Sequence, residues 1–208
     1  MTRLSSLALL MLSLSITNGL AAADLKYHRE DYPHWSDLDG NGLNTRHDLL
    51  ATQSTVKPSF SRDGKTVTRG RWVSPWTGQI YLDPFALDVD HTVPLGYAHA
   101  RGGKYWDRYQ REMFANDVRN LQVVEKGLNK EKGSAGITEW LPPTNQCQYI
   151  LRFYRIMKTY HLKYFTKEEP RALALVAQCQ RGEAWSNLLE SNTFHQVKFD
   201  TEFIKGSY

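Results

Sequence analysis

The sequence predicts an α+β fold in which a β-hairpin and a short helix are embedded in a mostly helical single domain. Leu87 to Asp90 alternates apolar and acidic residues, as a half-buried strand does, and Pro94 ends regular pairing soon afterwards. Leu121 to Val124 is a second β-prone run. Lys126 to Lys132, closed by Gly133, is typical of a short helix with its C-cap. The predicted order is therefore strand, long loop, strand and helix.

The segments around this unit carry weaker signals. We expect a helix between the two strands, from Gly103 to Phe114. Apolar residues recur at helical intervals from Gln146 to Tyr160, and a further helix should begin near Pro170 and end about Gln180. Residues 57–81 contain two β-like runs around an Asp-Gly turn, which predicts a peripheral hairpin.

The first 23 residues are predicted to be a secretory signal peptide. Arg3 provides a positive start, Leu7 to Leu14 is an apolar core interrupted only by Ser13, and three alanines precede Asp24, where we expect cleavage. The mature domain, 24–208, would keep 185 of the 208 residues and a net charge of +3, because Arg3 is the one charged residue of the leader. No later apolar run approaches the length of a membrane span.

Polar residues at the hairpin carry the strongest functional signal. Asp90 and His91 end the first strand in the order Asp-His-Thr-Val-Pro, Asn120 begins the second strand, and Asn129 follows nine residues later on the predicted helix. This set resembles the HNH nucleases, in the variant with Asn in the last position. Their site is a two-stranded hairpin packed on a helix with a metal ion between them, so the resemblance implies a ββα-metal core at about 85–133, with a helical part at about 144–208.

The resemblance extends over most of the mature chain, from about Tyr27 to Cys179. The chain is similar to one bacterial branch of this family, which includes secreted nucleases and the C-terminal domain of GmrSD-type restriction enzymes. The further segments that carry this resemblance lie before the hairpin, between its strands and after the helix: Gly78 to Asp83, Trp106, Arg111, Phe114 to Asp117, and Trp140-Leu141-Pro142-Pro143.

The resemblance also implies a role for each polar residue. Phosphodiester hydrolysis needs a base for water and a cation for the developing charge. His91 is expected to be the base, and its imidazole titrates near neutrality. Asp90 and Asn129 are expected to hold one divalent cation, Mg²⁺ in the first place and Mn²⁺ in the second, because oxygen ligands suit hard ions. Asn120 would brace the two loops, and Asp88 is an alternative ligand on the face of Asp90.

Basic residues beside this site would attract a polyanion without reading its sequence. The window from His99 to Lys132 holds eight Lys and Arg residues against five acidic ones. The candidates for contact with substrate phosphate are Arg46, Arg111, Lys130 and Lys132. For Arg111, a buried ion pair, with Asp117 as a possible partner, is an equally open interpretation. For any single basic residue, a solvated helix face is the simpler interpretation.

The stretch from Asp37 to Asp48 fits much of an EF-hand loop. Asp37, Asp39 and Asn41 stand at positions one, three and five, and a glycine stands at position six. Position twelve is Asp48 instead of the usual Glu, and position eight is not apolar. The related nuclease branch carries a similar stretch here, so Ca²⁺ binding is only the secondary interpretation of this loop.

The two cysteines, Cys147 and Cys179, lie one in each predicted C-terminal helix. An even pair in an exported chain predicts a disulfide, with two reduced core cysteines as the alternative. Their spacing matches no zinc motif.

Together these features predict a secreted or periplasmic, monomeric nuclease that cleaves DNA without strong sequence specificity. Nothing in the sequence resembles a helix that reads bases or a second DNA-binding module. Two alternatives stay open: an RNase or dual nuclease, and a noncatalytic exported module that binds Ca²⁺ or nucleic acid through the Asp37 to Asp48 loop. The mature form is expected to have no membrane partner.

Overall fold

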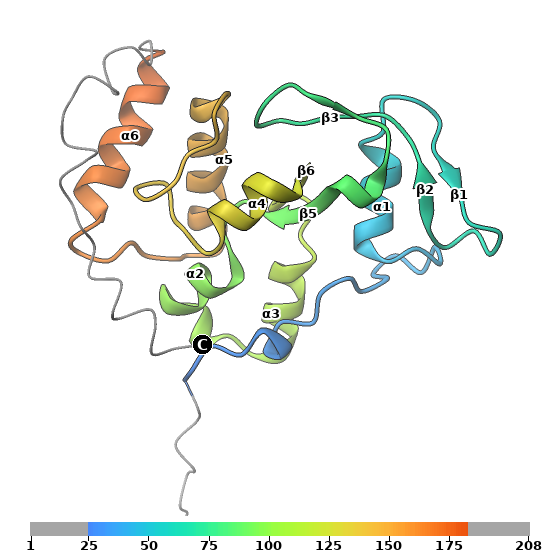
Figure 1. Cartoon of the computed structure of the whole chain (residues 1–208). Helices are drawn as coiled ribbons and strands as arrows, with labels where there is room; N and C mark the ends of the chain where they lie inside the picture. The colour runs from blue at the N-terminus through green and yellow to red at the C-terminus, as the bar shows by residue number, and fades with distance from the viewer. Residues whose placement is uncertain (1–24, 183–208) are drawn as a thin grey trace, which may run out of the picture.

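The computed structural model describes residues 25–182, and the predicted leader lies outside the described residues. Within this range the fold is α+β, as predicted (Figure 1). The six strands are β1 (Ser59–Phe60), β2 (Val67–Arg69), β3 (Trp72–Val73), β4 (Ile80–Tyr81), β5 (Leu87–His91) and β6 (Leu121–Glu125). The six α-helices are α1 (Thr45–Thr52), α2 (Leu95–Ala100), α3 (Arg108–Ala115), α4 (Lys126–Lys132), α5 (Gln146–Thr159) and α6 (Glu169–Arg181). Three short 3-10 helices are η1 (Arg29–Asp31), η2 (Pro84–Ala86) and η3 (Gly103–Tyr105).

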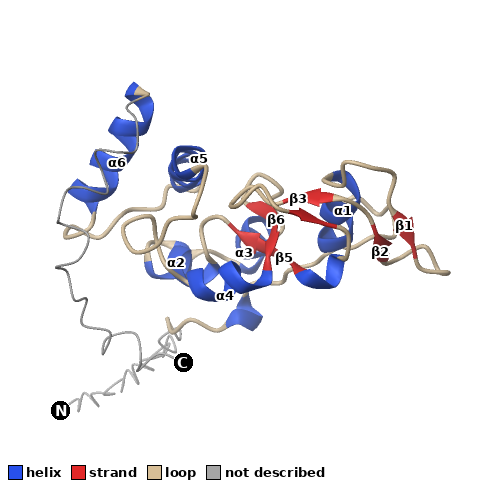
Figure 2. Ribbon diagram, turned by 45° about the horizontal axis from the view of Figure 1, so that its top comes forward, coloured by secondary structure: helices blue, strands red, loops and turns tan. Residues whose placement is uncertain are grey.

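The strands of the described range form three separate antiparallel pairs, β1–β2, β3–β4 and β5–β6. The first is the hairpin predicted around the Asp-Gly turn, where Gly64 adopts a φ of 73° that suits glycine. The pair β5–β6 is the longest and lies in the middle of the molecule (Figure 2). The helices α5 and α6 lie at one end of the molecule and the β1–β2 pair lies at the other.

The central pair is followed directly by α4, which contacts both of its strands. In β5 the buried residues Leu87, Val89 and His91 alternate with the half-buried Asp88 and Asp90, so the predicted alternation is confirmed. The long connection from β5 to β6 contains α2, η3 and α3. The predicted helix in this connection is α3, which begins only at Arg108 because a capping box formed by Asp107 and Gln110 fixes its start.

Two apolar cores flank the central pair. The smaller core joins α1 and the β2 and β3 strands to the inner face of the hairpin through Leu50, Trp72, Leu87 and Leu121. The larger core gathers α2, α3, α5 and α6 with residues from the loops between them. The β6 strand reaches both, since Val123 lies in the smaller core and Val124 in the larger one. The hairpin is therefore fixed from two sides.

The C-terminal helices α5 and α6 pack against each other, as their apolar periodicity predicted. The helix α6 has Pro170 in its first turn, the position expected from the sequence. A disulfide joins Cys147 in the first turn of α5 to Cys179 near the end of α6, so the predicted bond is present. Over residues 25–182, the helices are all too short or too polar to cross a membrane.

Candidate active site

The side chains of Asp88 and Asp90 emerge from one face of β5 toward α4. Asn129 on α4 donates a hydrogen bond from Nδ2 to Asp88 Oδ2 at 3.0 Å. Alternate residues of a strand share a face, and this places both carboxylates on the side that α4 covers. The structure thus brings together Asn129 and Asp88, the residue expected only as the alternative ligand.

Lys132, at the end of α4, occupies the space beside the second carboxylate. Its Nζ lies 2.8 Å from Asp90 Oδ2 and donates to the His91 carbonyl oxygen at 2.9 Å. The Lys132 side chain has no solvent exposure. The contact of Lys132 with substrate phosphate stays a prediction, and in the structure its buried ammonium holds two internal partners.

The buried pair of Lys132 and Asp90 sets the charge at this end of the hairpin. Burial raises the pKa of Asp90, and the ammonium of Lys132 offsets part of that rise. A carboxylate that is 11% exposed and paired in this way is partly neutralised by the protein itself. Asp88 accepts a hydrogen bond from a neutral amide instead, and the cation that interacts with its charge is Arg46.

His91 has a different set of neighbours from Asp90. Its ring lies between Trp35 and Phe114, with ring centroids 6.2 and 6.5 Å away. Its Nε2 is 2.8 Å from the Ala115 carbonyl oxygen. Because a carbonyl can only accept a hydrogen bond, Nε2 carries the proton, and the neutral ring keeps its lone pair on Nδ1. Burial lowers the pKa of His91 to about 3, so the ring is neutral at pH 7.

Asn120 is fully buried and joins the end of one strand to the start of the other. Its Oδ1 accepts a hydrogen bond from the Val93 backbone N–H at 2.8 Å, and its Nδ2 donates to the Val93 carbonyl at 3.2 Å. Its backbone carbonyl accepts from the Thr92 N–H. These three bonds hold the loop that follows His91 against the start of β6.

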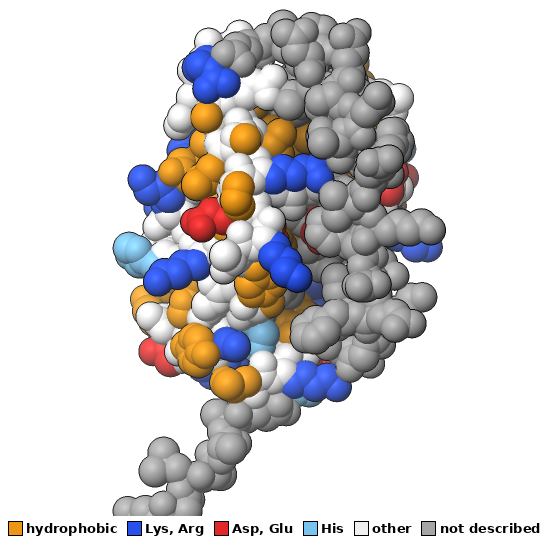
Figure 3. All heavy atoms as spheres, turned by 90° about the vertical axis from the view of Figure 1, so that its left-hand side faces the viewer, with side chains coloured by type: hydrophobic (Ala, Val, Ile, Leu, Met, Phe, Trp, Pro, Cys, Tyr) orange, Lys and Arg blue, Asp and Glu red, His pale blue; other side chains and the backbone are white. Residues whose placement is uncertain are grey.

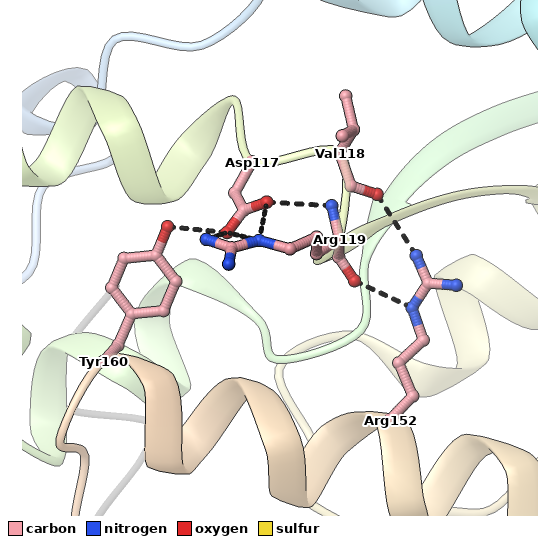
Figure 4. A network of polar contacts seen from close by, with 5 residues as sticks. All are labelled: Asp117, Val118, Arg119, Arg152 and Tyr160. Carbon is pink, nitrogen blue, oxygen red and sulfur yellow. Dashed lines mark hydrogen bonds and ion pairs between the residues drawn. The ribbon is translucent and has the colours of Figure 1, made fainter.

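The turn before β6 is held by Asp117 together with Arg119, Arg152 and Tyr160, whose part in it the sequence did not indicate (Figure 4). Asp117 pairs with Arg119 and accepts a hydrogen bond from the Tyr160 hydroxyl at 2.7 Å. Arg152 of α5 donates to three carbonyl oxygens, those of Val118, Arg119 and Leu121. One of several basic residues in an amphipathic helix gives no sequence signal for such a role.

The remaining phosphate candidates lie in different surroundings. Arg111 pairs with Asp31 at 3.1 Å and donates to the Lys104 carbonyl, so it is in an ion pair, but its partner is not Asp117. Arg46 donates from Nη2 to the Leu87 carbonyl at 3.1 Å, and burial lowers its pKa while the charge of Asp88 opposes that change. Lys130 is exposed on α4.

The acidic side chains of the EF-hand-like loop converge on Asn41. The Asn41 amide Nδ2 donates to Asp39 and to Asp48, and the Asn41 backbone N–H donates to Asp37 and Asp39. These bonds close the loop with its own donors. Ca²⁺ binding by this loop stays a prediction.

The donor atoms at the hairpin suit a hard divalent ion if an amide takes part. Within residues 25–182, no three His, Cys, Asp or Glu side chains are placed to hold a metal ion by themselves. Asp88 and Asn129 are direct neighbours, and Mg²⁺ is commonly held by one or two protein oxygens with water filling its other positions. Asp88 and Asn129 therefore fit such an ion, and Asp90 would join them only by sharing its charge with Lys132.

Comparisons with known proteins confirm the predicted resemblance to the C-terminal domain of GmrSD restriction enzymes. The family model described as GmrSD restriction endonucleases, C-terminal domain, matches residues 40–174, which include the hairpin, α4 and α5. A relative from Arthroderma benhamiae, described as an uncharacterized secreted protein, is 32% identical over 158 residues, which cover 74% of this chain and 76% of the relative. No solved structure matches the chain. The chain belongs to the family of GmrSD restriction endonuclease C-terminal domains.

Proposed function

We propose that this protein is a secreted, divalent-metal-dependent endonuclease that hydrolyses phosphodiester bonds of DNA without strong sequence specificity. The observation that carries the proposal is the 3.0 Å contact between Asn129 of α4 and Asp88 of β5, the strand that ends at His91, inside a domain of a restriction endonuclease family. Export is supported by the predicted leader and by the relative that is named as secreted.

The cation would be held by Asn129 and by the carboxylates of β5, Asp88 and Asp90. When bound, it would supply positive charge to the scissile phosphate and to the departing oxygen, and it would make water more acidic. The Asn129 amide can turn its oxygen toward the cation, because the same group offers either N–H or C=O by a rotation. Lys132 would keep the second carboxylate in place through its 2.8 Å contact.

His91 would take the proton from the attacking water at Nδ1. The bond from Nε2 to the Ala115 carbonyl fixes the tautomer, so the lone pair is on the nitrogen that faces away from Ala115. An anionic phosphate beside the ring would raise the pKa of His91, since an opposite charge favours the protonated form. His91 ends β5, and a phosphate at this end of the strand would lie within reach of the His91 ring on one face of the hairpin and of the carboxylates on the other.

Contacts with the sugar-phosphate backbone would provide most of the affinity. The exposed Lys130 on α4 and the half-buried Arg46 beside Asp88 are the proposed phosphate contacts near the site. Arg111 would add to the positive electrostatic potential around the site while it keeps its ion pair with Asp31. Contacts of this kind do not read sequence, which suits a nonspecific nuclease.

The test is digestion of plasmid DNA by the purified mature protein with Mg²⁺, Mn²⁺, Ca²⁺ or EDTA. His91→Asn removes the base, and we expect the rate to fall about 100-fold or more, as general-base loss does. The matched control is His161→Asn, an exposed histidine with a φ of 53° that asparagine tolerates. Cleavage at the full rate by His91→Asn would show that His91 is not the base. Cleavage at the full rate in EDTA would show that the reaction needs no divalent metal. Parallel assays with RNA decide between DNase and dual nuclease.

A second candidate function is a noncatalytic exported Ca²⁺-binding module. The convergence of Asp37, Asp39 and Asp48 on Asn41 favours it. In that case the wild-type chain would cut nothing with any metal, and Ca²⁺ would raise its Tm in a manner abolished by Asp37→Asn.

A further inference from the structure

A cavity of about 330 Å³ lies between the β6 strand and the helix α5. This size falls in the range of sites that hold small organic groups, which begins at about 300 Å³. Its walls come from the turn before β4, from β6 and from the first three turns of α5. The lining residues are Pro75, Trp76, Gln122, Asn145, Gln148, Tyr149, Leu151, Arg152 and Arg155.

The cavity adjoins the candidate active site. Gln122 pairs across the hairpin with Asp90, so its side chain shares the face of that carboxylate. Thr92, the residue after His91, donates a hydrogen bond from Oγ1 to Gln122 Oε1 at 3.3 Å. The buried Tyr149 donates from its hydroxyl to the Thr92 carbonyl at 3.2 Å. The end of β5 at His91 and the cavity are therefore adjacent, so a polynucleotide that passes His91 can continue into the cavity.

The charge of the lining is entirely positive. Gln148, Arg152 and Arg155 are spaced by four and three residues, so they form one stripe of α5 along the cavity. The lining includes two arginines and three amide side chains but no carboxylate. Two guanidinium groups on one stripe repel each other, and an anion between or beside them would relieve that repulsion.

The guanidinium groups of Arg152 and Arg155 differ in their hydrogen-bond partners within the protein. Arg152 directs its guanidinium to the carbonyls of Val118 and Arg119 in the turn before β6 (Figure 4) and to that of Leu121 at the start of β6. Arg155 is exposed one turn further along α5. Arg155 therefore has the guanidinium that can turn to a ligand, while Arg152 contributes fixed positive charge behind it.

The basic character of the cavity stands out against the surface around α6. Among the described side chains visible on that side, Lys and Arg are scattered between hydrophobic ones and do not gather into one patch (Figure 3). A scattered surface charge attracts a polyanion but does not position it. The cavity combines charge, hydrogen-bonding amides and an apolar wall from Pro75 and Leu151 in one place.

We propose that this cavity binds one nucleotide unit of the substrate strand, next to the scissile phosphate, with Arg155 on its phosphate. Gln122 and Gln148 would hydrogen-bond the sugar or the base edge, and Pro75 and Leu151 would pack against its apolar faces. This inference rests on the proposed nuclease function and adds where the strand lies. The ligand chemistry is a phosphodiester, which either DNA or RNA supplies.

The test measures binding of fluorescent 12-nucleotide DNA and RNA strands by anisotropy, with the full mature chain carrying His91→Asn so that the strands stay intact. Arg155→Ala is expected to raise Kd about tenfold, the effect of losing one charged hydrogen bond. The substitution should also make the slope of the logarithm of the association constant against the logarithm of the salt concentration less negative by about 0.7, the value for one phosphate contact with a single strand. Gln148→Ala should raise Kd without changing that slope.

The matched control is Arg62→Ala. Arg62 is exposed on the β1–β2 turn at the far end of the molecule, and its removal changes the net charge equally. Equal Kd values and slopes for Arg155→Ala and Arg62→Ala would overturn the inference. In the background with His91 intact, Arg155→Ala should raise KM and leave kcat unchanged, and a loss in kcat alone would also overturn it.

The two proposals can fail separately. Cleavage that depends on His91 but not on Arg155 would leave the nuclease and remove the cavity as its nucleotide subsite. Absence of any binding or cleavage by the chain without substitutions would remove both. A stronger effect with RNA than with DNA in the Arg155 and Gln148 variants would assign the strand to RNA.

Discussion

Asp90 and His91 are neighbours in the chain but lie in different environments. Asp90 meets the buried ammonium of Lys132, whereas the His91 ring lies between Trp35 and Phe114. The alternation of side chains along a strand produces this separation without any change in the backbone. The consequence is that a carboxylate and a neutral imidazole lie on adjacent residues without forming an ion pair.

Among the single residues of the site, Lys132 is the one whose replacement should lower the free energy of unfolding most. Lys132→Met leaves the buried Asp90 carboxylate without its cation, and breaking a buried pair in this way costs about 3 to 5 kcal/mol. We expect the free energy of unfolding in urea, measured with EDTA present, to fall by that amount. The double variant Asp90→Asn with Lys132→Met leaves no unpaired charge and should recover most of the loss. Equal instability of the single and double variants would contradict this account.

The turn before β6 shows how an element outside the site controls it. Arg152 of α5 fixes two carbonyls of this turn and one at the start of β6, and Asn120 at the end of the turn holds the loop after His91. The geometry of the hairpin end therefore depends on the docking of α5. A change in that helix should reach His91 through Asn120 and through the hydrogen bond from Tyr149 to the Thr92 carbonyl.

Asp117 makes the stability of this turn depend on pH. Burial raises the pKa of Asp117, but hydrogen bonds from Arg119 and Tyr160 lower it by more, so its pKa in the folded chain is below its usual value. A depressed carboxyl pKa adds stability above the unfolded value of about 4, and that stability is lost as the pH falls through the folded pKa. We expect Asp117→Asn to destabilise the protein at pH 7, with the difference from wild type shrinking below about pH 4. Urea titrations at several pH values measure it, and a difference that is constant with pH would contradict the prediction.

The disulfide ties the two C-terminal helices together. It closes a separation of 32 residues between Cys147 and Cys179, and the chain-entropy model assigns such a loop about 3 to 4 kcal/mol. The double variant Cys147→Ser with Cys179→Ser should lose this amount of unfolding free energy. Dithiothreitol should lower the Tm of wild type toward that of the variant and leave the variant unchanged. Two free thiols titrated in unreduced wild-type protein would show that the bond is absent.

At the scale of the whole molecule, the hairpin is the part that both cores share. The smaller core reaches it through Leu121 and Val123, and the larger core through Val124. The candidate active site at this hairpin is therefore held by long-range packing from both cores, and such packing fixes the positions of its donor atoms. The net charge of +3 expected for the mature chain is modest, so attraction of a polyanion depends on where the basic groups lie.

Much of this architecture could be predicted because its signals are local. The alternation in 87–91, the short helix after Glu125 and the apolar periodicity of 146–159 each follow from residues a few positions apart. The helix between the strands was expected to start at Gly103, but the 3-10 turn there and the capping box at Asp107 moved the start of α3 to Arg108. The signal for this cap is the Asp-x-x-Gln spacing of Asp107 and Gln110, which a pattern of apolar residues does not include.

By itself, the sequence determined the hairpin, the helix that follows it, the cysteine pair and the set of polar residues at the strand end. Only the tertiary structure decided which of them meet: Asn129 with Asp88, Lys132 with Asp90, Arg111 with Asp31, and Arg152 with the turn that carries Asn120. The physical reason is that strand and helix periodicity acts between near neighbours in the chain. The partner of a long charged side chain is chosen instead by which distant segments the two cores bring within about 3 Å, the length of a hydrogen bond.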